Sequence, residues 1–185
     1  MANANARHPD HGGYAPPVRF HVEQPIVAER AAVEQAFVDP DFYRSLGDLD
    51  ALAPPEVLQC EPDPRSAEAV LLRVRYRFKG SLSPAVRRVV DPDRLSWVDG
   101  SRFDRASHLM SFHMEPDHYP DRLWCEGTYR FDPGADGSTV MVMDGEVRVS
   151  FPLVGGVVER AVVSGLRQHL VAVAKTVAKR PAGSR

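Results

Sequence analysis

The chain has 185 residues, of which 43% are hydrophobic, 26% charged and 8% aromatic. These fractions are typical of a globular domain and exclude a collagen-like chain, a coiled coil and a wholly disordered protein. With 25 acidic and 23 basic residues the formal net charge is −2, so no overall electrostatic field favours nucleic acid or an anionic membrane as a partner.

The two ends of the chain have no apolar periodicity, so we expect one domain at residues 17–180 between flexible tails at 1–16 and 181–185. The most apolar stretch, 151–174, is interrupted by charged side chains, which argues against an integral membrane segment. We see no signal-peptide pattern at the start, and the two cysteines are too far apart to form a metal-binding pair. The sequence therefore predicts a cytoplasmic protein and leaves its oligomeric state open.

The first predicted element is a strand, because apolar and polar residues alternate from residue 18 to 22. Residues 27–37 are rich in helix formers and predict a helix. Residues 41–46 predict a second short helix, with Asp39 as its N-cap and Pro40 at its first position.

Six segments after residue 56 have the two-residue period and the composition of strands. They are 57–60, 69–78, 95–103, 107–114, 123–131 and 138–150. A helical turn is predicted at 84–90, between the second and third of them. Short turns rich in Pro, Gly and Asp favour an antiparallel meander.

Residues 153–178 have a helical period, and their apolar side chains, with Leu166, His169 and Val173 among them, fall on one face. One helix covers only part of a sheet of six to seven strands. The sequence therefore predicts an α+β fold in which a curved antiparallel sheet is clasped by the long C-terminal helix. The two short helices close one end, and space is left for an internal pocket.

The junction between the last strand and the last helix reads V-x-V-x-x-P-L-V-G-G-x-x-E. Its residues are Val147, Val149, Pro152, Leu153, Val154, Gly155, Gly156 and Glu159. Together with the order of elements, this junction resembles the START-like (SRPBCC, helix-grip) superfamily and, more narrowly, an uncharacterised bacterial family within it. The resemblance implies a helix-grip fold with a deep hydrophobic pocket. It implies no single activity, because that scaffold hosts carriers, receptors, hydrolases and cyclases.

Each conspicuous residue of the junction has a structural interpretation. Pro152 is expected to begin the helix, and Gly155 and Gly156 to let the helix approach the sheet closely. Glu159 lies near the helix N-terminus, where an anion is favoured. We interpret the junction as architecture, and an anion site at the paired glycines is the alternative.

A helix that grips the sheet points the inward-facing side chains of both into one pocket. The predicted ligand-binding residues are Val70, Leu72, Val74, Tyr76, His108, Met110, Phe112, Tyr129, Met141, Met143, Leu166 and His169. Their mainly apolar character favours binding or carriage of a hydrophobic small molecule, lipid-like or polyketide-like. His108 is expected at the pocket rim, and we expect no cofactor.

Two alternatives stay open. The first is a cyclase, dehydratase or hydrolase that uses His169 as its acid or base, with Tyr76 or Asp99 as partner. Two points weaken it: a buried histidine is more often structural, and Gly100 after Asp99 favours a turn there. The second is a protein-interaction domain with a filled core. We favour binding over catalysis, because the common nucleophile, phosphate-binding and metalloprotease motifs are missing from the sequence.

The histidines do not predict a metal site. His108 and His113 are five positions apart on one predicted strand, so they point to opposite faces. His8 and His11 lie in the predicted N-terminal tail.

The arginines at 73, 75 and 77 alternate with the apolar residues of their strand. A site for single-stranded nucleic acid interleaves exposed aromatic rings with such charges, but the aromatic residues here fall on the opposite face. We expect these arginines to form a solvated outer surface, paired with neighbouring carboxylates.

Overall fold

The computed structural model describes residues 16–46, 49, 51–151 and 153–180. Both predicted tails, apart from residue 16, lie outside this part of the chain, as do His8, His11 and Pro152. The strands are β1 (Val18–Ile26), β2 (Glu56–Asp63), β3 (Ser66–Arg77), β4 (Ser96–Asp104), β5 (Leu109–Pro116), β6 (Leu123–Pro133) and β7 (Thr139–Val149). The helices are α1 (Arg30–Phe37), α2 (Pro40–Ser45), α3 (Pro84–Arg87) and α4 (Gly155–Ala178).

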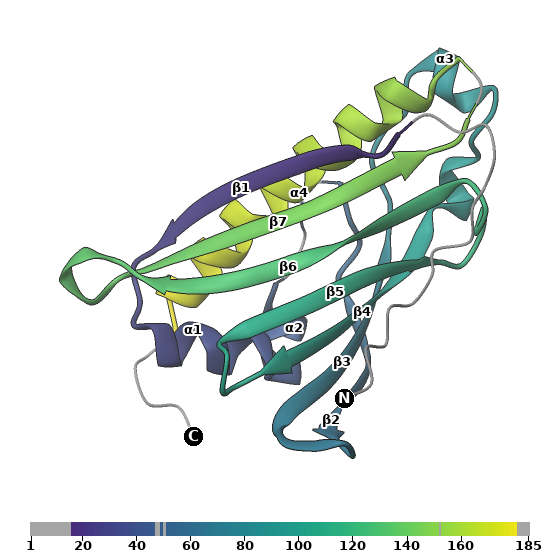
Figure 1. The fold of residues 1–185 in the computed structure, drawn as a ribbon. Helices are drawn as coiled ribbons and strands as arrows, with labels where there is room; N and C mark the ends of the chain where they lie inside the picture. Colours follow the sequence, from purple (N-terminus) through teal and green to yellow (C-terminus); the bar gives the residue numbers. More distant parts are fainter. Residues whose placement is uncertain (1–15, 47–48, 50, 152, 181–185) are drawn as a thin grey trace.

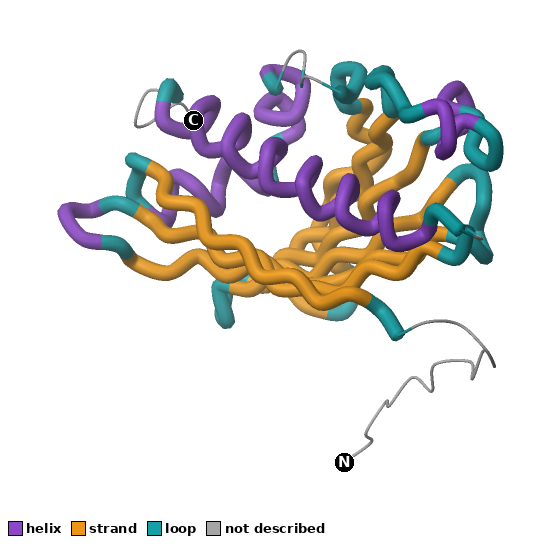
Figure 2. Tube along the Cα trace, turned by 90° about the horizontal axis from the view of Figure 1, so that it is seen from above, coloured by secondary structure: helices purple, strands orange, loops and turns teal. Residues whose placement is uncertain are grey.

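The strands form one antiparallel sheet in the spatial order β1-β7-β6-β5-β4-β3-β2. Consecutive strands from β2 to β7 are neighbours, and β1 closes the row beside β7. The sheet is curved, and α4 lies across one of its faces while α1 and α2 pack near the C-terminal end of α4 (Figures 1 and 2). The α+β helix-grip architecture predicted from the sequence is confirmed.

Helix α2 begins as predicted, because the Asp39 carboxylate accepts a hydrogen bond from the Asp41 N–H at 2.9 Å. Helix α1 begins three residues later than predicted, at Arg30. Strand β1 continues to Ile26, and the Thr139 hydroxyl donates to the Ala28 carbonyl at 2.8 Å. These contacts hold the chain outside the helix up to residue 29.

The first turns of α4 contact the end of β7 at two points, and both contacts are with Val149. A Cβ on Gly155 would lie 2.5 Å from the Val149 carbonyl oxygen, so only glycine fits there. The Glu159 carboxylate accepts a hydrogen bond from the Val149 N–H at 2.9 Å. The hydrogen-bond partner of Glu159 is therefore the last residue of β7. We had expected the carboxylate to interact with the N-terminus of the helix. A Cβ on Gly156 would meet nothing closer than 3.7 Å, so close approach explains Gly155 alone.

The C-terminal half of α4 is seated more deeply than its N-terminal half. Leu170, Val173, Ala174 and Val177 are buried. The apolar residues of the first turns are only half-buried: Val158, Val162, Val163 and Leu166. The helical period of the sequence also places Ala161 and Gly165 on the apolar face. Both are exposed, so the buried face is slightly rotated from the predicted one.

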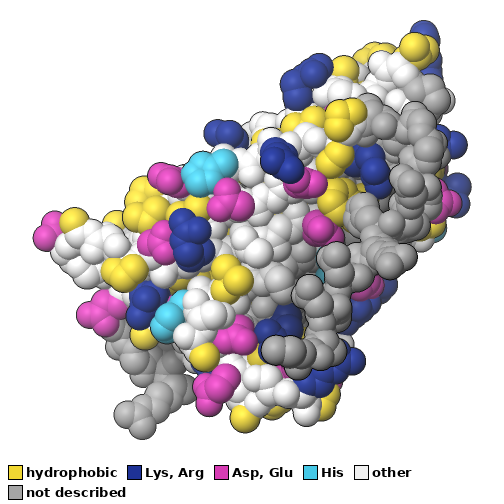
Figure 3. Space-filling model, viewed as in Figure 1, with side chains coloured by type: hydrophobic (Ala, Val, Ile, Leu, Met, Phe, Trp, Pro, Cys, Tyr) yellow, Lys and Arg dark blue, Asp and Glu magenta, His cyan; other side chains and the backbone are white. Residues whose placement is uncertain are grey.

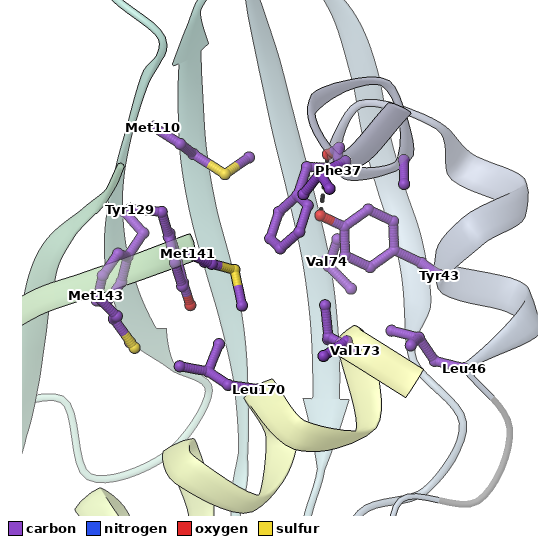
Figure 4. Close-up of a cluster of buried hydrophobic side chains, with 14 of the residues drawn as sticks. Phe37, Tyr43, Leu46, Val74, Met110, Tyr129, Met141, Met143, Leu170 and Val173 are labelled. Carbon is purple, nitrogen blue, oxygen red and sulfur yellow. Dashed lines mark hydrogen bonds between the residues drawn. The ribbon is translucent and has the colours of Figure 1, made fainter. Parts of the chain in front are cut away.

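A cluster of large side chains fills the space between α4, the short helices and the sheet (Figure 4). Met141 and Met143 of β7 are fully buried there, and Phe37 of α1 meets Phe131 edge-to-face at 5.1 Å between ring centroids. The Tyr43 hydroxyl donates to the Phe37 carbonyl at 3.0 Å, which fixes α2 against α1.

The outer face of the sheet carries paired charges, as predicted. Arg73 makes two hydrogen bonds to Glu115, at 2.8 and 2.6 Å. Arg75 pairs with Asp117 at 3.1 Å and Arg77 with Glu56 at 3.0 Å. Positive and negative side chains are interspersed over the face seen in Figure 3. Among the described helices, none is both long and apolar enough to cross a membrane.

Candidate active or ligand-binding site

A small cavity lies between α4, α2 and the inner face of β3–β6. Its free volume is about 20 Å³, which is room for about one water molecule. The lining residues are Phe37, Phe42, Tyr43, Leu72, Val74, Tyr76, Asp99, Ser101, Met110, Tyr129, His169 and Val173. Half of these twelve side chains are polar. The sequence predicted a larger and more apolar space, and this expectation is wrong for this conformation because aromatic side chains of α1 and α2 reach into it.

Asp99 is the carboxylate that the described part of the chain contributes to the cavity lining. It lies in the middle of β4, opposite Val74 of β3 and Met114 of β5. Burial raises the pKa of the Asp99 carboxyl to about 6, and the hydrogen bond donated by the Ser101 hydroxyl at 2.8 Å opposes this rise. An acid with this pKa exchanges protons near neutral pH.

The turn that the sequence favoured at Asp99 is therefore wrong. Gly100 belongs to the strand, and a Cβ there would lie 2.6 Å from Cε1 of His113 on the neighbouring strand. Glycine at this position accommodates the His113 ring on the outer face, so it does not mark a bend. The inward carboxylate, which was the less favoured reading of the sequence, is what the fold contains.

His169 enters the cavity from α4. Its Nδ1 is buried without a hydrogen-bond partner among the described residues. Burial lowers the pKa of the imidazole to about 4, so the ring is neutral at physiological pH. The Tyr76 ring meets it edge-on, with 5.6 Å between ring centroids. An unpaired buried nitrogen is uncommon and indicates a group that awaits a partner.

Three tyrosines complete the polar part of the lining: Tyr43, Tyr76 and Tyr129. Burial raises the pKa of each phenol above its ordinary value, and the nearby Asp99 charge adds to the rise. These hydroxyls therefore stay protonated at neutral pH and serve as hydrogen-bond donors or acceptors. Tyr76 also stacks on the half-buried Trp97 ring, with centroids 5.9 Å apart.

The predicted ligand-binding residues divide into two groups. Those that line the cavity are Leu72, Val74, Tyr76, Met110, Tyr129 and His169. Those that lie outside the lining are Val70, His108, Phe112, Met141, Met143 and Leu166. Most of the second group still face the interior as core residues; Phe112, for example, packs against the lining residue Tyr129, with 5.0 Å between ring centroids.

His108 is the exception within that group. It lies in the turn before β5, with a φ of 54°, and is not on the strand where we placed it. Its Nδ1 is 2.8 Å from the Glu34 carboxylate of α1. His108 therefore joins the β4–β5 turn to α1.

Six lining residues were missing from the predicted ligand-binding set: Phe37, Phe42, Tyr43, Asp99, Ser101 and Val173. Asp99 had been named only as a partner of His169 in the enzyme alternative. The sequence contained information that could have identified some of these residues. Val173 was on the predicted apolar face of the C-terminal helix, and the aromatic residues fall in the two short helices expected to close one end of the pocket. Ser101 had no signal, because a serine in a strand is ordinarily exposed.

A seven-stranded antiparallel sheet clasped by a long C-terminal helix over an internal cavity is the helix-grip architecture of the START superfamily. The chain belongs to the family described as "Protein of unknown function (DUF2505)", whose model matches residues 21–180. No protein with a curated description matches the sequence.

Several solved structures share the fold. An aromatase/cyclase from a Streptomyces species has a TM-score of 0.64 and 13% identity, covering 91% of this chain and 99% of that one. Truncated norcoclaurine synthase from Thalictrum flavum has a TM-score of 0.59 and 17% identity, covering 92% and 99%. A START superfamily protein from Mycobacterium smegmatis has a TM-score of 0.58 and 12% identity, covering 86% and 96%. At these identities the likeness is one of fold.

Proposed function

We propose that this protein binds a small organic molecule between α4 and the sheet, with a polar group of the ligand in the cavity and its apolar body beside it. The observation that carries the proposal is the unpartnered Nδ1 of His169, buried in the same cavity as the Asp99 carboxylate. Both groups are costly to bury, and a bound ligand supplies the missing hydrogen bonds.

The apolar body would lie next to the cavity, against side chains that the protein itself covers only in part. Trp97 of β4 and Met114 of β5 are half-buried on the inner face, and so is Leu166 of α4, one turn before His169. The cavity itself accepts only a group of about the size of water, so this arrangement suits a compact ring compound of polyketide type better than a long lipid chain. The fold's similarity to an aromatase/cyclase supports the same kind of ligand.

Native mass spectrometry of the freshly purified protein tests the proposal, together with titration of an apolar fluorescent probe. We expect an added mass that organic solvent removes, and a probe that this ligand displaces. The Val173→Leu variant adds one methylene group to the cavity wall and is expected to weaken probe binding. Val171→Leu is the matched control, because Val171 is exposed on the same helix. A chain that has only its own mass and excludes the probe would support a filled-core interaction domain instead.

A second candidate is an enzyme that transfers a proton, and the pKa of Asp99 is the observation that favours it. Asp99, Tyr76 and His169 share a cavity of the size of one water molecule, so they can act on one substrate atom. Because the imidazole is neutral with its pKa near 4, Asp99 is the better acid or base and His169 the better hydrogen-bond partner. Slow conversion of the displaced ligand by the wild type, abolished in Asp99→Asn while binding persists, would establish this function.

A further inference from the structure

Among the described residues, the lining of the cavity carries a negative charge and no positive one. Asp99 is ionised above its pKa of about 6, and it accepts one hydrogen bond, from Ser101. No lysine or arginine is among the described residues that line the cavity. His169, the remaining basic group, stays neutral because burial lowers the pKa of its imidazole to about 4.

A buried carboxylate is stabilised best by a cation that also donates hydrogen bonds. Several other carboxylates of the sheet are paired in this way, among them Glu115 with Arg73 and Asp117 with Arg75. Asp99 lies apart from these pairs on the inner face of the sheet, where the described lining residues offer it no cation, so a cationic group on a ligand would complement its charge.

The remaining walls also suit a cation. The rings of Phe37, Phe42, Tyr43, Tyr76 and Tyr129 line the cavity, and aromatic faces attract positive charge once water is excluded. In the tautomer that carries the proton on Nε2, the unpartnered Nδ1 of His169 is a hydrogen-bond acceptor in addition to the Asp99 carboxylate.

The size of the cavity fits one particular cation. A free volume of about 20 Å³ accommodates an ammonium group, which is close to water in size, and excludes a guanidinium. The carbon skeleton attached to it would then lie beside Tyr76 and Trp97, whose ring centroids are 5.9 Å apart.

We infer that the ligand is a small primary amine with an aromatic body, whose ammonium group lies in the cavity between the Asp99 carboxylate and the His169 imidazole. This inference rests on the proposed function and names the class of ligand for the same site.

The test compares two probes that differ only in the group directed to the cavity: 2-phenylethylamine and 2-phenylethanol. Their binding to the full chain is measured by ligand-observed NMR and calorimetry at pH 7.5. We expect the amine to bind at least about tenfold more tightly than the alcohol, which is the discrimination given by about 1.4 kcal/mol. Asp99→Asn should abolish this preference by weakening binding of the amine far more than binding of the alcohol. Asp117→Asn is the control, since it alters a carboxylate of the outer face.

The pH dependence of wild-type binding provides a test that requires no variant. The titratable groups that face Asp99 are Tyr43 of α2, Tyr76 of β3, Cys125 and Tyr129 of β6, His169 of α4 and, through the sheet, His113 of β5. The phenols and the thiol stay protonated below pH 8, and His169 stays neutral above pH 5. Affinity for the amine should therefore fall about tenfold from pH 7.5 to pH 5, as the Asp99 carboxylate takes up its proton.

The possible results distinguish failure of the inference from failure of the proposed function. An alcohol that binds as well as the amine, or an amine affinity that is independent of pH, overturns the inference and leaves the proposed binding function standing. If neither probe binds and native mass spectrometry finds no ligand, both the inference and the proposed function fail. Tighter binding of the amine that is lost at pH 5 and in Asp99→Asn supports both.

Discussion

Replacement of Asp99 by asparagine tests the physical environment of the cavity directly. Asparagine keeps the shape of the side chain and the carbonyl oxygen that accepts from Ser101, and it removes the charge. Burial raises the pKa of Asp99 from 3.8 to about 6, so the folded chain binds its proton more tightly than the unfolded chain does. Ionisation of Asp99 therefore costs folding free energy, and Asp99→Asn is expected to stabilise the ligand-free protein.

The sign and the size of the effect follow from the two pKa values. Between pH 3.8 and about 6 the folded chain holds the proton that the unfolded chain has lost, so the contribution of Asp99 to stability falls as pH rises through this window. Above it the cost is complete, about 3 kcal/mol at ~1.4 kcal/mol for each pKa unit. Asp99→Asn should gain about 3 kcal/mol over wild type at pH 7.5 and about half of that at pH 5.

Urea denaturation of both chains at the two pH values measures this difference, after any bound ligand has been removed. Asp117→Asn provides a control of opposite sign. The Ser96 hydroxyl and then Arg75 hold the pKa of Asp117 below its ordinary value, so this substitution should destabilise at pH 7.5 and matter less as pH falls through that lowered pKa. An Asp99→Asn chain that is less stable than wild type by the same amount at both pH values would refute the reasoning.

Three further predictions concern the two ends of α4. Gly155→Ala should lower the melting temperature, because its Cβ would lie 2.5 Å from the Val149 carbonyl oxygen, although alanine favours helix by about 1 kcal/mol. Gly156→Ala, with its nearest neighbour at 3.7 Å, should be neutral or stabilising, and equal losses at both positions would contradict this account. Glu159→Ala leaves the Val149 N–H without its acceptor and should cost about 1–3 kcal/mol in urea denaturation, whereas Glu159→Gln, which keeps an acceptor oxygen, should cost less. Arg180→Gln should cost less than about 1 kcal/mol, because the Arg180 ion pair at the other end is partly exposed; a loss above about 2 kcal/mol would show that it is stronger than such pairs ordinarily are.

The fold was predictable because its elements follow simple periods. The alternation of apolar residues with arginines in β3 defines both faces of that strand, and the helical period of α4 defines its buried face to within a slight rotation. Errors arose where a tertiary contact overrides local preference. Helix α1 begins late because Thr139 binds the Ala28 carbonyl in the bend before the helix, and 111 positions separate these two residues in the chain.

The site was less predictable than the fold, because the type of a single residue in the sequence is compatible with more than one structural role. Gly100 was read as a turn that would place Asp99 at a bend, whereas the glycine accommodates the His113 ring of the next strand. Strand register decides between these readings, and register depends on the whole sheet. The volume of the cavity was overestimated for a similar reason. Phe42 and Tyr43 line the cavity, and the depth to which they enter it depends on how α2 packs against the sheet. The amino-acid composition does not determine this packing.

The unequal seating of α4 has a consequence for how a ligand exchanges. Contacts at Val149 hold the first turn, and the ion pair of Arg180 with Asp39 holds the last, while the half-buried stretch around Leu166 lies between them. Local opening of this middle stretch breaks few contacts and leaves the rest of the domain folded. Its backbone amides should therefore exchange with deuterium faster than those of residues 170–177. The ligand would then enter and leave at the rate of this local opening, which is independent of the rate of global unfolding.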